Sequence, residues 1–510
     1  MMLPSMKYSG STRTSGFSEF RGYKHLPSAQ DGEIWDMGNM ASDGYPALTP
    51  RKPRTLEKTL NKPNGIFPKV AVDGTNFIYN GTVKGTVTDT PKTFCAMYNR
   101  IIILPDKAYY NTLTDTFGSL ESAYTGSVSF RDGTLYGESA AANTIYASGV
   151  TWSDYFKVGD AVTVSGCTAH TDNNKTPIIR EIDGDELHFY ENVFDTGSES
   201  GVTIARTVPD LDFICENENR LWGCQGSTIY ASKLGDPFNW NVFDSLSTDS
   251  YSAPVGSAGD FTGCVSYLGY PIFFKPDYIY KVYGDKPTNF QVMSSASLGV
   301  AAGSAKSLAV AGETLFYLSR AGIVAYTGGI PAQISRDLGA EFQDAVAGSD
   351  GLRYYVSMSD GSAQHLFVYD TALGLWHRED DLAVLDFTWD GGLYALAADG
   401  RVLRFRSDGG EVISSFVEFA DFYAGSIGKK NVQKLFVRAE LEAGAVLRMY
   451  IRYRGGESWR LLKTVNASEK RAFYIPVMPN RCDYYRLRFE GTGDYTIHSI
   501  ANELKIGSAR

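Results

Sequence analysis

The sequence lacks the features of a membrane-spanning or disulfide-rich secreted protein. No run approaches the roughly 20 apolar residues that a membrane-spanning helix needs, and the opening stretch MMLPSMKYSGSTRTSG has no apolar signal-peptide core. Six cysteines are scattered without a CxxC pair: Cys95, Cys167, Cys215, Cys224, Cys264 and Cys482. This spacing favours reduced, mostly buried thiols and disfavours zinc. We therefore expect no membrane span and synthesis in a cytoplasm.

Motifs that carry chemistry are also missing. There is no GxxxxGK[ST] phosphate loop and no GxSxG nucleophile turn, and the six histidines form no HxxxH pair. The segment 182–189, IDGDELHF, lacks the liganding positions of a calcium loop and is better interpreted as an Asp-Gly hairpin turn. We expect no catalytic residue, no cofactor and no metal, and hence a protein that is not an enzyme.

Positive charge is scarce outside the C-terminal region. The net charge is −10, yet residues 429–510 hold 16 Lys and Arg against 8 Asp and Glu, so the first 428 residues carry −18. An acidic body is unsuited to tight nucleic-acid binding, whose affinity comes largely from neutralised phosphates. The basic C-terminal region is either a docking surface for an acidic partner or simply a solvated face.

Glycine and aromatic residues, by contrast, are plentiful. There are 52 Gly and 13% aromatics, including 32 Tyr. Glycine serves tight turns, and aromatic side chains fit half-buried pleated surfaces, so together they predict many short strands. Hydrophobic residues make up 43% of the chain, which is enough for large cores. We predict an all-β protein.

Aromatic hairpins recur along the chain at a nearly constant interval. They begin near Asn99, Asn219, Gly269, Gly312, Gly351 and Gly391. From Asn219 onward the starts are 50, 43, 39 and 40 residues apart. A strand-only repeat near forty residues is typical of β-propeller blades. Six blades are countable and the N-terminal stretch could supply part of a seventh, which predicts a six- to seven-bladed β-propeller.

The composition shifts give five predicted segments. Residues 1–63 read as an extended N-terminal arm, which is either a disordered tail or ordered only against a neighbouring subunit. Residues 64–117 would form the first propeller blade and 207–415 the remaining blades. Between them, 118–206 reads as an inserted small β-barrel or sandwich domain. Period-two alternation after about residue 416 predicts a C-terminal β-sandwich over 416–510.

Three stretches carry a resemblance to a known family. They are NRLWGCQGSTIYASKLGDPFNW at 219–240, PNRCDYYRLRFEGTGDYTIHSI at 479–500, and a set of residues near the N-terminus. That set is Asp31, Gly32, Glu33, Ile34, Asp36, Met37, Asn39, Tyr45, Pro46, Pro50 and Arg51. Together they resemble the β-propeller tail nozzle (tail tubular) proteins of short-tailed bacteriophages and related tail proteins.

The resemblance implies a structural protein of the virion tail, made in the cytoplasm of a bacterial host. Nozzle subunits form a homo-oligomeric ring, commonly a hexamer, below the portal and adaptor proteins, and other tail parts attach to it. The ring encloses the channel through which DNA leaves the capsid, and DNA passes without specific binding. The family has no catalytic residues to transfer. An acidic body agrees with such a channel, because fixed phosphate contacts would retain DNA.

Two groups of residues are candidates for contacts between subunits. One is the aromatic loop 236–240 with Phe238 and Trp240, and the other is the basic cluster Arg51, Lys52 and Arg54. A ring needs heterologous contacts on two sides of each subunit, which such groups would provide. For Trp240 the alternative is that it closes its own blade.

A different class of function stays open beside the structural one. β-Propellers also bind or degrade polysaccharides, and aromatic side chains beside Asn and Asp suit stacking against sugars. The alternative is therefore a glycan-binding or polysaccharide-degrading β-propeller protein of a tail or cell surface. No dedicated glycosidase motif marks a pair of catalytic carboxylates among the 58 Asp and Glu.

Overall fold

A computed structural model describes the chain except residues 1–10, 134–140, 191–192, 410–411, 424–428, 454–457, 467–470, 478–480 and 507–510. It divides into two compact units. One comprises Met1–Leu60 with Lys306–Arg510, and the other Asn61–Ala305.

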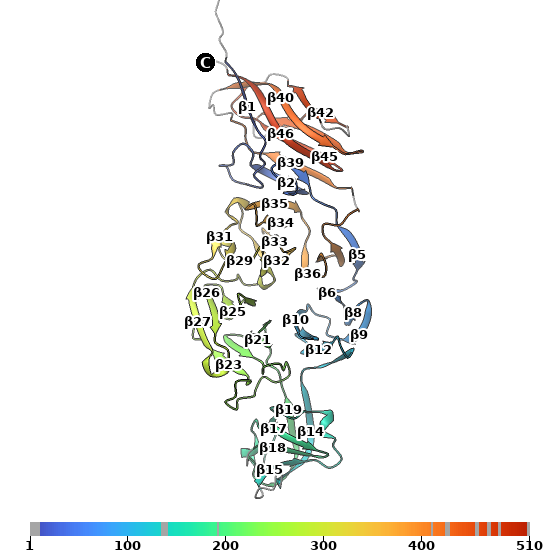
Figure 1. The fold of residues 1–510 in the computed structure, drawn as a ribbon, viewed down its shortest axis with the longest axis vertical. Coiled ribbons are helices and arrows are strands. Elements are labelled where there is room, and N and C mark those ends of the chain that lie inside the picture. Colours follow the sequence, from blue (N-terminus) through green and yellow to red (C-terminus); the bar gives the residue numbers. More distant parts are fainter. Residues whose placement is uncertain are drawn as a thin grey trace, which may run out of the picture. The chain divides into compact units, whose positions relative to one another are not determined.

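Asn61–Ala305 contains four antiparallel four-stranded sheets, each with strands in chain order (Figure 1). The first has β6 (Pro63–Phe67), β7 (Val70–Asp73), β8 (Asn76–Tyr79) and β9 (Thr82–Thr86), and the second β10 (Thr93–Met97), β11 (Arg100–Leu104), β12 (Ala108–Asn111) and β13 (Thr116–Ser119). The third has β20 (Phe213–Asn217), β21 (Arg220–Gln225), β22 (Thr228–Ala231) and β23 (Tyr251–Pro254), and the fourth β24 (Gly263–Tyr267), β25 (Tyr270–Lys275), β26 (Tyr278–Tyr283) and β27 (Gln291–Ala296).

Tight turns and alternating side chains explain these sheets. Asn219 and Gly269 adopt positive φ of 62° and 78° in the turns that open two of the predicted hairpins, a conformation that Asn and Gly tolerate best. Successive side chains then point to opposite faces, so both faces bury apolar residues against the next sheet. In the third sheet, Phe213 packs in one apolar layer and Ile214 in the layer on the other side.

Residues 63–119 form two four-stranded sheets where we expected a single blade. Their strands are only four or five residues long, and we had interpreted each four-stranded sheet as one hairpin. A continuous apolar layer with Val72, Phe77, Ile103 and Tyr110 lies between the two sheets.

The segment between the second and third sheets forms a separate β-structure. One six-stranded sheet, in the order β16-β19-β14-β15-β18-β17, runs from residue 122 to residue 206. Its strands are β14 (Ser122–Gly133), β15 (Ala141–Tyr146), β16 (Thr163–Ser165), β17 (Ile179–Asp183), β18 (Glu186–Phe189) and β19 (Gly197–Arg206). Trp152, Phe156 and Phe189 are among the residues of a core that belongs to this segment alone.

The other unit contains three more four-stranded sheets. Two are in chain order: β28 (Ala309–Ala311), β29 (Thr314–Ser319), β30 (Gly322–Tyr326) and β31 (Ala332–Gln333), then β32 (Gln343–Ser349), β33 (Arg353–Ser359), β34 (Gln364–Asp370) and β35 (Leu375–Asp380). The third has β36 (Val384–Trp389), β37 (Leu393–Ala397) and β38 (Arg401–Arg404), and its fourth strand is β5 (Thr55–Thr59) from the N-terminal arm.

The same unit ends in two five-stranded sheets. One has the order β2-β39-β45-β41-β42, with β2 (Ile34–Gly38), β39 (Ser414–Phe419), β45 (Arg486–Thr492), β41 (Val446–Arg452) and β42 (Arg460–Val465). The other contains β1 (Ser11–Phe17), β46 (Tyr495–Ile506), β40 (Lys430–Leu441), β43 (Arg471–Pro476) and β44 (Arg481–Cys482). A short two-stranded sheet joins β3 (Met40–Ala41) to β4 (Thr49–Pro50).

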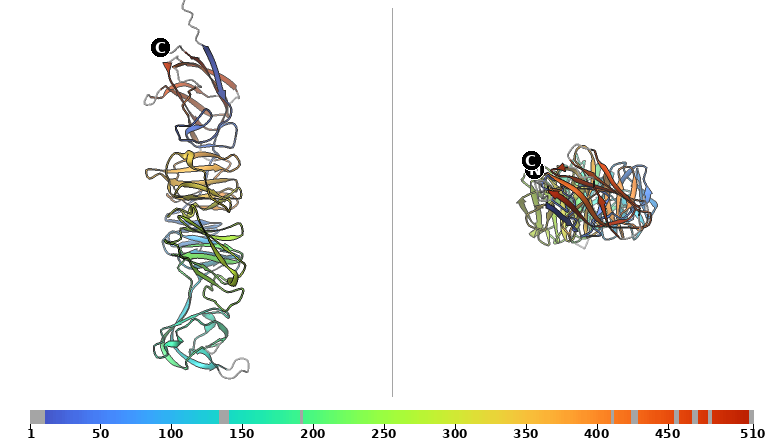
Figure 2. Two further views of the ribbon diagram at one scale, coloured as in Figure 1. Left: turned by 90° about the vertical axis from the view of Figure 1, so that its left-hand side faces the viewer. Right: turned by 90° about the horizontal axis from the view of Figure 1, so that it is seen from above.

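The N-terminal arm is therefore not what the sequence led us to expect. From residue 11 onward it is ordered within its own chain, since β1, β2 and β5 each extend a sheet built from residues beyond 380. Figure 2 shows the blue N-terminal strands among the orange and red strands of the C-terminal sheets. Backbone pairing with distant strands, which composition does not reveal, supplies the order.

The all-β prediction is confirmed. The regular helices in the described residues are short 3-10 turns, the first at Trp152–Asp154, and none of them could cross a membrane. Seven four-stranded antiparallel sheets, with further β-structure beside them, are consistent with a β-propeller that carries extra β-domains. The number of blades in a closed ring stays a prediction.

Candidate functional site

The aromatic loop 236–240 contacts the six-stranded sheet segment of its own chain. Asn239 Nδ2 donates to Asp160 Oδ1 at 2.9 Å, and Asn239 Oδ1 accepts from the backbone N–H of Ala161 at 3.1 Å. Asp160 also pairs with Arg206 at 2.5 Å between Oδ2 and Nη1. Phe238 lies under that guanidinium, 5.1 Å from ring centroid to Cζ. The loop thus fixes residues 122–206 to the neighbouring four-stranded sheets.

Trp240 is a core residue and not a subunit contact. Only 1% of it is exposed, and it packs between the second and third sheets with Ile102 and Leu221. Its indole Nε1 donates to the Pro237 carbonyl at 3.0 Å, so its polar atom is also satisfied internally. Phe238 is half-buried in the same cluster. The alternative that Trp240 closes its own sheet agrees with this burial.

The basic cluster is also engaged within the chain. Arg54 bridges Glu379 at 2.5 Å and Asp380 at 2.7 Å, and its side chain is 7% exposed. Arg51 Nε donates to Asn39 Oδ1 at 2.7 Å, and the Arg51 side chain is 10% exposed. Neither guanidinium is available to a neighbouring subunit. The Lys52 side chain is 51% exposed, so within the basic cluster it stays a candidate for a contact between subunits.

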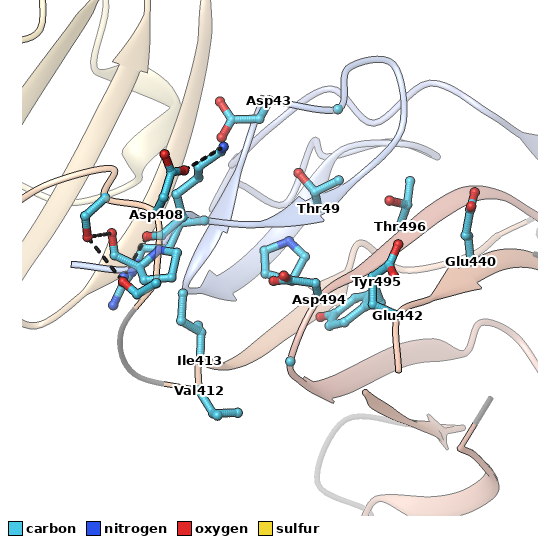
Figure 3. Close-up of a pocket in the computed structure, with 18 of the residues that line it drawn as sticks. Asp43, Thr49, Asp408, Val412, Ile413, Glu440, Glu442, Asp494, Tyr495 and Thr496 are labelled. Atoms are coloured by element: carbon cyan, nitrogen blue, oxygen red, sulfur yellow. Dashed lines mark hydrogen bonds and ion pairs between the residues drawn. The ribbon is translucent and has the colours of Figure 1, made fainter. Parts of the chain in front are cut away.

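A cavity of about 1020 Å³ is lined in part by carboxylates. Asp43 and Asp408 lie on one side and Glu440 on the other (Figure 3). Asp43 is held by Arg353 at 2.9 Å and Arg406 at 3.0 Å, and the Asp408 side chain is fully exposed. Glycoside hydrolysis needs two carboxylates aimed at one bond, and we assign no such pair here.

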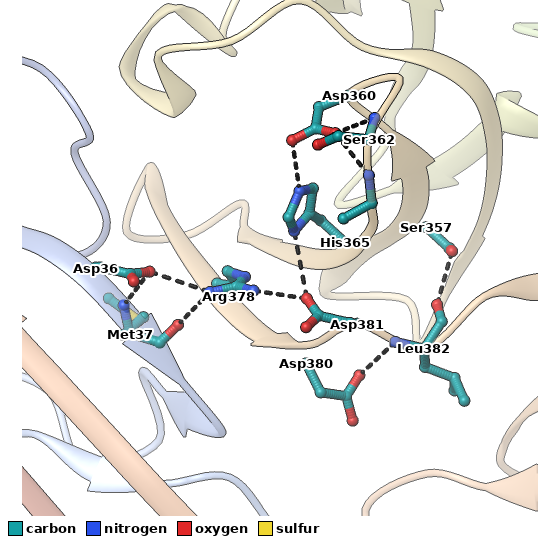
Figure 4. Close-up of polar contacts among 11 residues, drawn as sticks. Asp36, Met37, Ser357, Asp360, Ser362, His365, Arg378, Asp380, Asp381 and Leu382 are labelled. Atoms are coloured by element: carbon teal, nitrogen blue, oxygen red, sulfur yellow. Dashed lines mark hydrogen bonds and ion pairs between the residues drawn. The ribbon is translucent and has the colours of Figure 1, made fainter.

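The His365 side chain is flanked by two carboxylates (Figure 4). His365 Nε2 lies 2.9 Å from Asp360 and its Nδ1 lies 3.3 Å from Asp381. A general base needs one ring nitrogen directed at a nucleophile or substrate, and here both nitrogens face carboxylates. The hydrogen bond from His365 holds the pKa of Asp360 below its usual value.

This histidine network is structural. Arg378 continues it, pairing with Asp381 at 2.6 Å and with Asp36 of β2 at 3.1 Å. The chain of contacts therefore links the turn after β33 to the N-terminal arm. Among the residues that the structure describes, no group of three or more His, Cys, Asp or Glu is placed to hold a metal ion.

A smaller cavity of about 280 Å³ lies between the third and fourth sheets of Asn61–Ala305. Its lining combines aromatic rings with polar side chains: Trp222, Tyr270 and Phe290 with Asn217, Glu218 and Asp285. The Lys281 ammonium sits over the Tyr270 ring, 3.9 Å from its centroid. Aromatic walls with a few polar groups are typical of small-ligand sites.

Comparisons with known proteins give only remote structural likenesses. No family model matches the chain and no curated protein matches it. An exo-β-1,3-galactanase of Phanerochaete chrysosporium, solved with galactose, aligns at 10% identity over 57% of this chain and 94% of its own, with a TM-score of 0.24. PorZ, a surface component of the type-IX secretion system of Porphyromonas gingivalis, aligns at 12% identity over 88% and 77%, with a TM-score of 0.27. We draw no functional conclusion from scores this low.

Proposed function

We propose that this chain is a structural protein of a tailed-bacteriophage virion, a nozzle-like subunit whose seven four-stranded sheets close into a β-propeller. Its subunits form a ring, expected to be a hexamer, around the DNA exit channel below the portal and adaptor. The proposal assigns no catalytic role to the chain.

The observation that carries the proposal is the place of the resemblance-bearing N-terminal residues in the fold. Ile34 and Met37 are fully buried, and Asn39 joins three segments. Its Nδ2 donates to the Ser414 carbonyl at 2.9 Å, its Oδ1 accepts from Arg51, and its backbone N–H donates to the Glu379 carbonyl. Residues on which the resemblance to the nozzle family rests thus join the C-terminal sheets to β35, which agrees with a role as a scaffold.

Protein identification on purified virions tests this function. We expect peptides of this chain in gradient-purified particles of the phage that encodes it, at a copy number matching the tail ring. Gold-labelled antibody should mark the tail end of the particle. If the chain is found only in the lysate and never in particles, the virion assignment is wrong.

A second candidate is a carbohydrate-binding protein, favoured by the cavity at Tyr270. Tyr270, Glu218 and Asp285 line this cavity together, so it combines an aromatic ring with acceptors for sugar hydroxyls. A glycan array with the full chain would support this candidate through a saturable hit that Tyr270→Ala abolishes. Release of reducing sugars from a bound polysaccharide would extend it to a degrading enzyme.

A further inference from the structure

Two cysteines that are 49 positions apart in the sequence meet in the layer between the third and fourth sheets. Cys215 lies on β20 and Cys264 on β24, the first strands of adjacent sheets. Both side chains belong to the apolar layer that lies between these two sheets. Both are free thiols on partly buried residues.

Strand alternation places the Cys215 and Cys264 side chains in the same apolar layer. On β20, Phe213 and Cys215 belong to the apolar layer facing β24, whereas Ile214 belongs to the layer on the opposite side. Cys264 enters that same layer from the other sheet, together with its cross-strand partner Phe273. Each of the two sheets therefore contributes one of the two cysteines to this layer.

From this arrangement we infer that Cys215 and Cys264 are a latent disulfide, a modification site that staples two neighbouring sheets once the protein leaves a reducing compartment. The inference is independent of the proposed virion function. It needs only an oxidising surrounding, in which protein disulfides persist.

The reaction balances with a low-molecular-weight disulfide, such as oxidised glutathione, as the oxidant. One cysteine thiolate attacks the glutathione disulfide, forms a mixed disulfide and releases one glutathione thiolate. The second cysteine thiolate then attacks the protein sulfur of the mixed disulfide and releases the second glutathione thiolate. The protein loses two protons and two electrons, and the oxidant is reduced to two glutathione molecules.

The surroundings make this reaction slow and selective. Burial, with the neighbouring Cys215 as a smaller cause, raises the pKa of the Cys264 thiol well above its ordinary value. Since only the thiolate is nucleophilic, the rate should rise with pH through the alkaline range. Cys224 on β21 lies in the same layer but is fully buried, which makes it the less accessible competitor.

Peptide mapping distinguishes these pairings, because trypsin separates the three cysteines. Cys215 falls in 207–220, Cys224 in 221–233 and Cys264 in 234–281. The native full chain is incubated with oxidised glutathione at mildly alkaline pH, blocked with N-ethylmaleimide and digested without reduction. We expect 207–220 joined to 234–281, a mass loss of about 2 Da, and a melting temperature raised by roughly 5 °C or more.

Three outcomes would overturn the inference: unchanged free thiols, glutathione adducts without the cross-link, or a link from Cys215 to Cys224. Cys264→Ser should remove both the cross-link and the oxidant-induced rise in melting temperature. Cys167→Ser, in the separate core of the six-stranded sheet, should leave both intact. The mapping uses the native chain, so it decides the matter even if a variant folds poorly.

Discussion

The six-stranded sheet at 122–206 and the C-terminal sheets are both attached to four-stranded sheets, but in different ways. The former has its own core and meets its neighbours through Asn239, which hydrogen-bonds to Asp160 and Ala161, and through Phe238, which lies under the Arg206 guanidinium. The latter share strands with the N-terminal arm, which also completes the sheet of β36–β38. The first is an accessory joined through a few local contacts, whereas the second is interleaved with the rest of its unit.

The largest difference between the two regions is expected when the N-terminal arm and the six-stranded sheet segment are deleted in separate variants. A chain without residues 1–60 loses β1, β2 and β5, so three sheets are left with exposed edges and uncovered cores. We expect that chain to be insoluble or to lose cooperative unfolding. Replacing 123–205 by a short Gly-Ser linker should instead leave a soluble, folded protein, because Ser122 and Arg206 are paired neighbours. Circular dichroism melts compare the two, and equal damage would refute the distinction.

The second largest effect on stability is expected from removing the buried indole of Trp240. Trp240→Ala deletes a side chain that is 1% exposed in the layer between two sheets, so we expect a loss of about 4 kcal/mol in unfolding free energy. The matched control is Phe243→Ala, whose ring is 61% exposed and should change stability by less than about 0.5 kcal/mol. Urea unfolding of both variants measures the difference, and similar losses would place Trp240 outside the core.

Breaking the ion pair between Asp160 and Arg206 is expected to cost slightly less unfolding free energy. Asp160→Ala leaves the Arg206 guanidinium buried without its carboxylate and removes an acceptor from Asn239. We expect a loss of about 3 kcal/mol. Glu186→Ala tests the exposed pair with Arg131 at 3.5 Å in the same segment, which should cost under about 1 kcal/mol. Chemical denaturation checks both, and a neutral Asp160→Ala would show that the joint does not need this pair.

Acid should weaken the interleaved unit through His377 of β35. Burial lowers the pKa of His377 from 6.5 to about 4, so the folded state keeps it neutral where the unfolded chain takes up a proton. Its contribution is present above pH 6.5 and is lost as the pH falls toward 4, by up to about 3 kcal/mol. Urea unfolding at several pH values should show a shallower decline for His377→Gln. An identical pH profile would contradict the assignment.

Lys52 should give the smallest effect. Its side chain is 51% exposed and lies 4.0 Å from Asp408, which is fully exposed. Lys52→Ala should change the unfolding free energy by less than about 0.5 kcal/mol. A weaker assembly at unchanged monomer stability, measured by mass photometry, would identify Lys52 as the subunit contact. A large loss of monomer stability would contradict its exposed position.

The sequence predicted what depends on local chemistry. The turns at Asn219 and Gly269 and the aromatic strands after them lie where punctuation and composition indicated, since φ preference and side-chain alternation act over a few residues. It did not predict which distant strands pair. All five residues of β5 are exposed and only Leu56 is apolar, so no apolar pattern marks it as the fourth strand of a sheet more than 300 positions away.

The burial of Arg54 and Trp240 within the chain was missed for a related reason. Charge and aromaticity marked Arg54 and Trp240 as interaction residues, but composition does not distinguish a partner in the same chain from one in a neighbour. The sequence did contain information that would place Cys215 and Cys264 in one layer. The two cysteines lie three and four residues before equivalent turns of successive hairpins. That one-residue stagger reverses the face of the strand on which the side chain lies.

The most direct test of the structural assignment is the mass of the assembled particle. Mass photometry of the purified full chain, over a concentration series, should reveal a species near six times the 55.9 kDa subunit mass, and electron microscopy of that species should show closed rings. A single population at the subunit mass at every concentration, with no rings, would contradict the account.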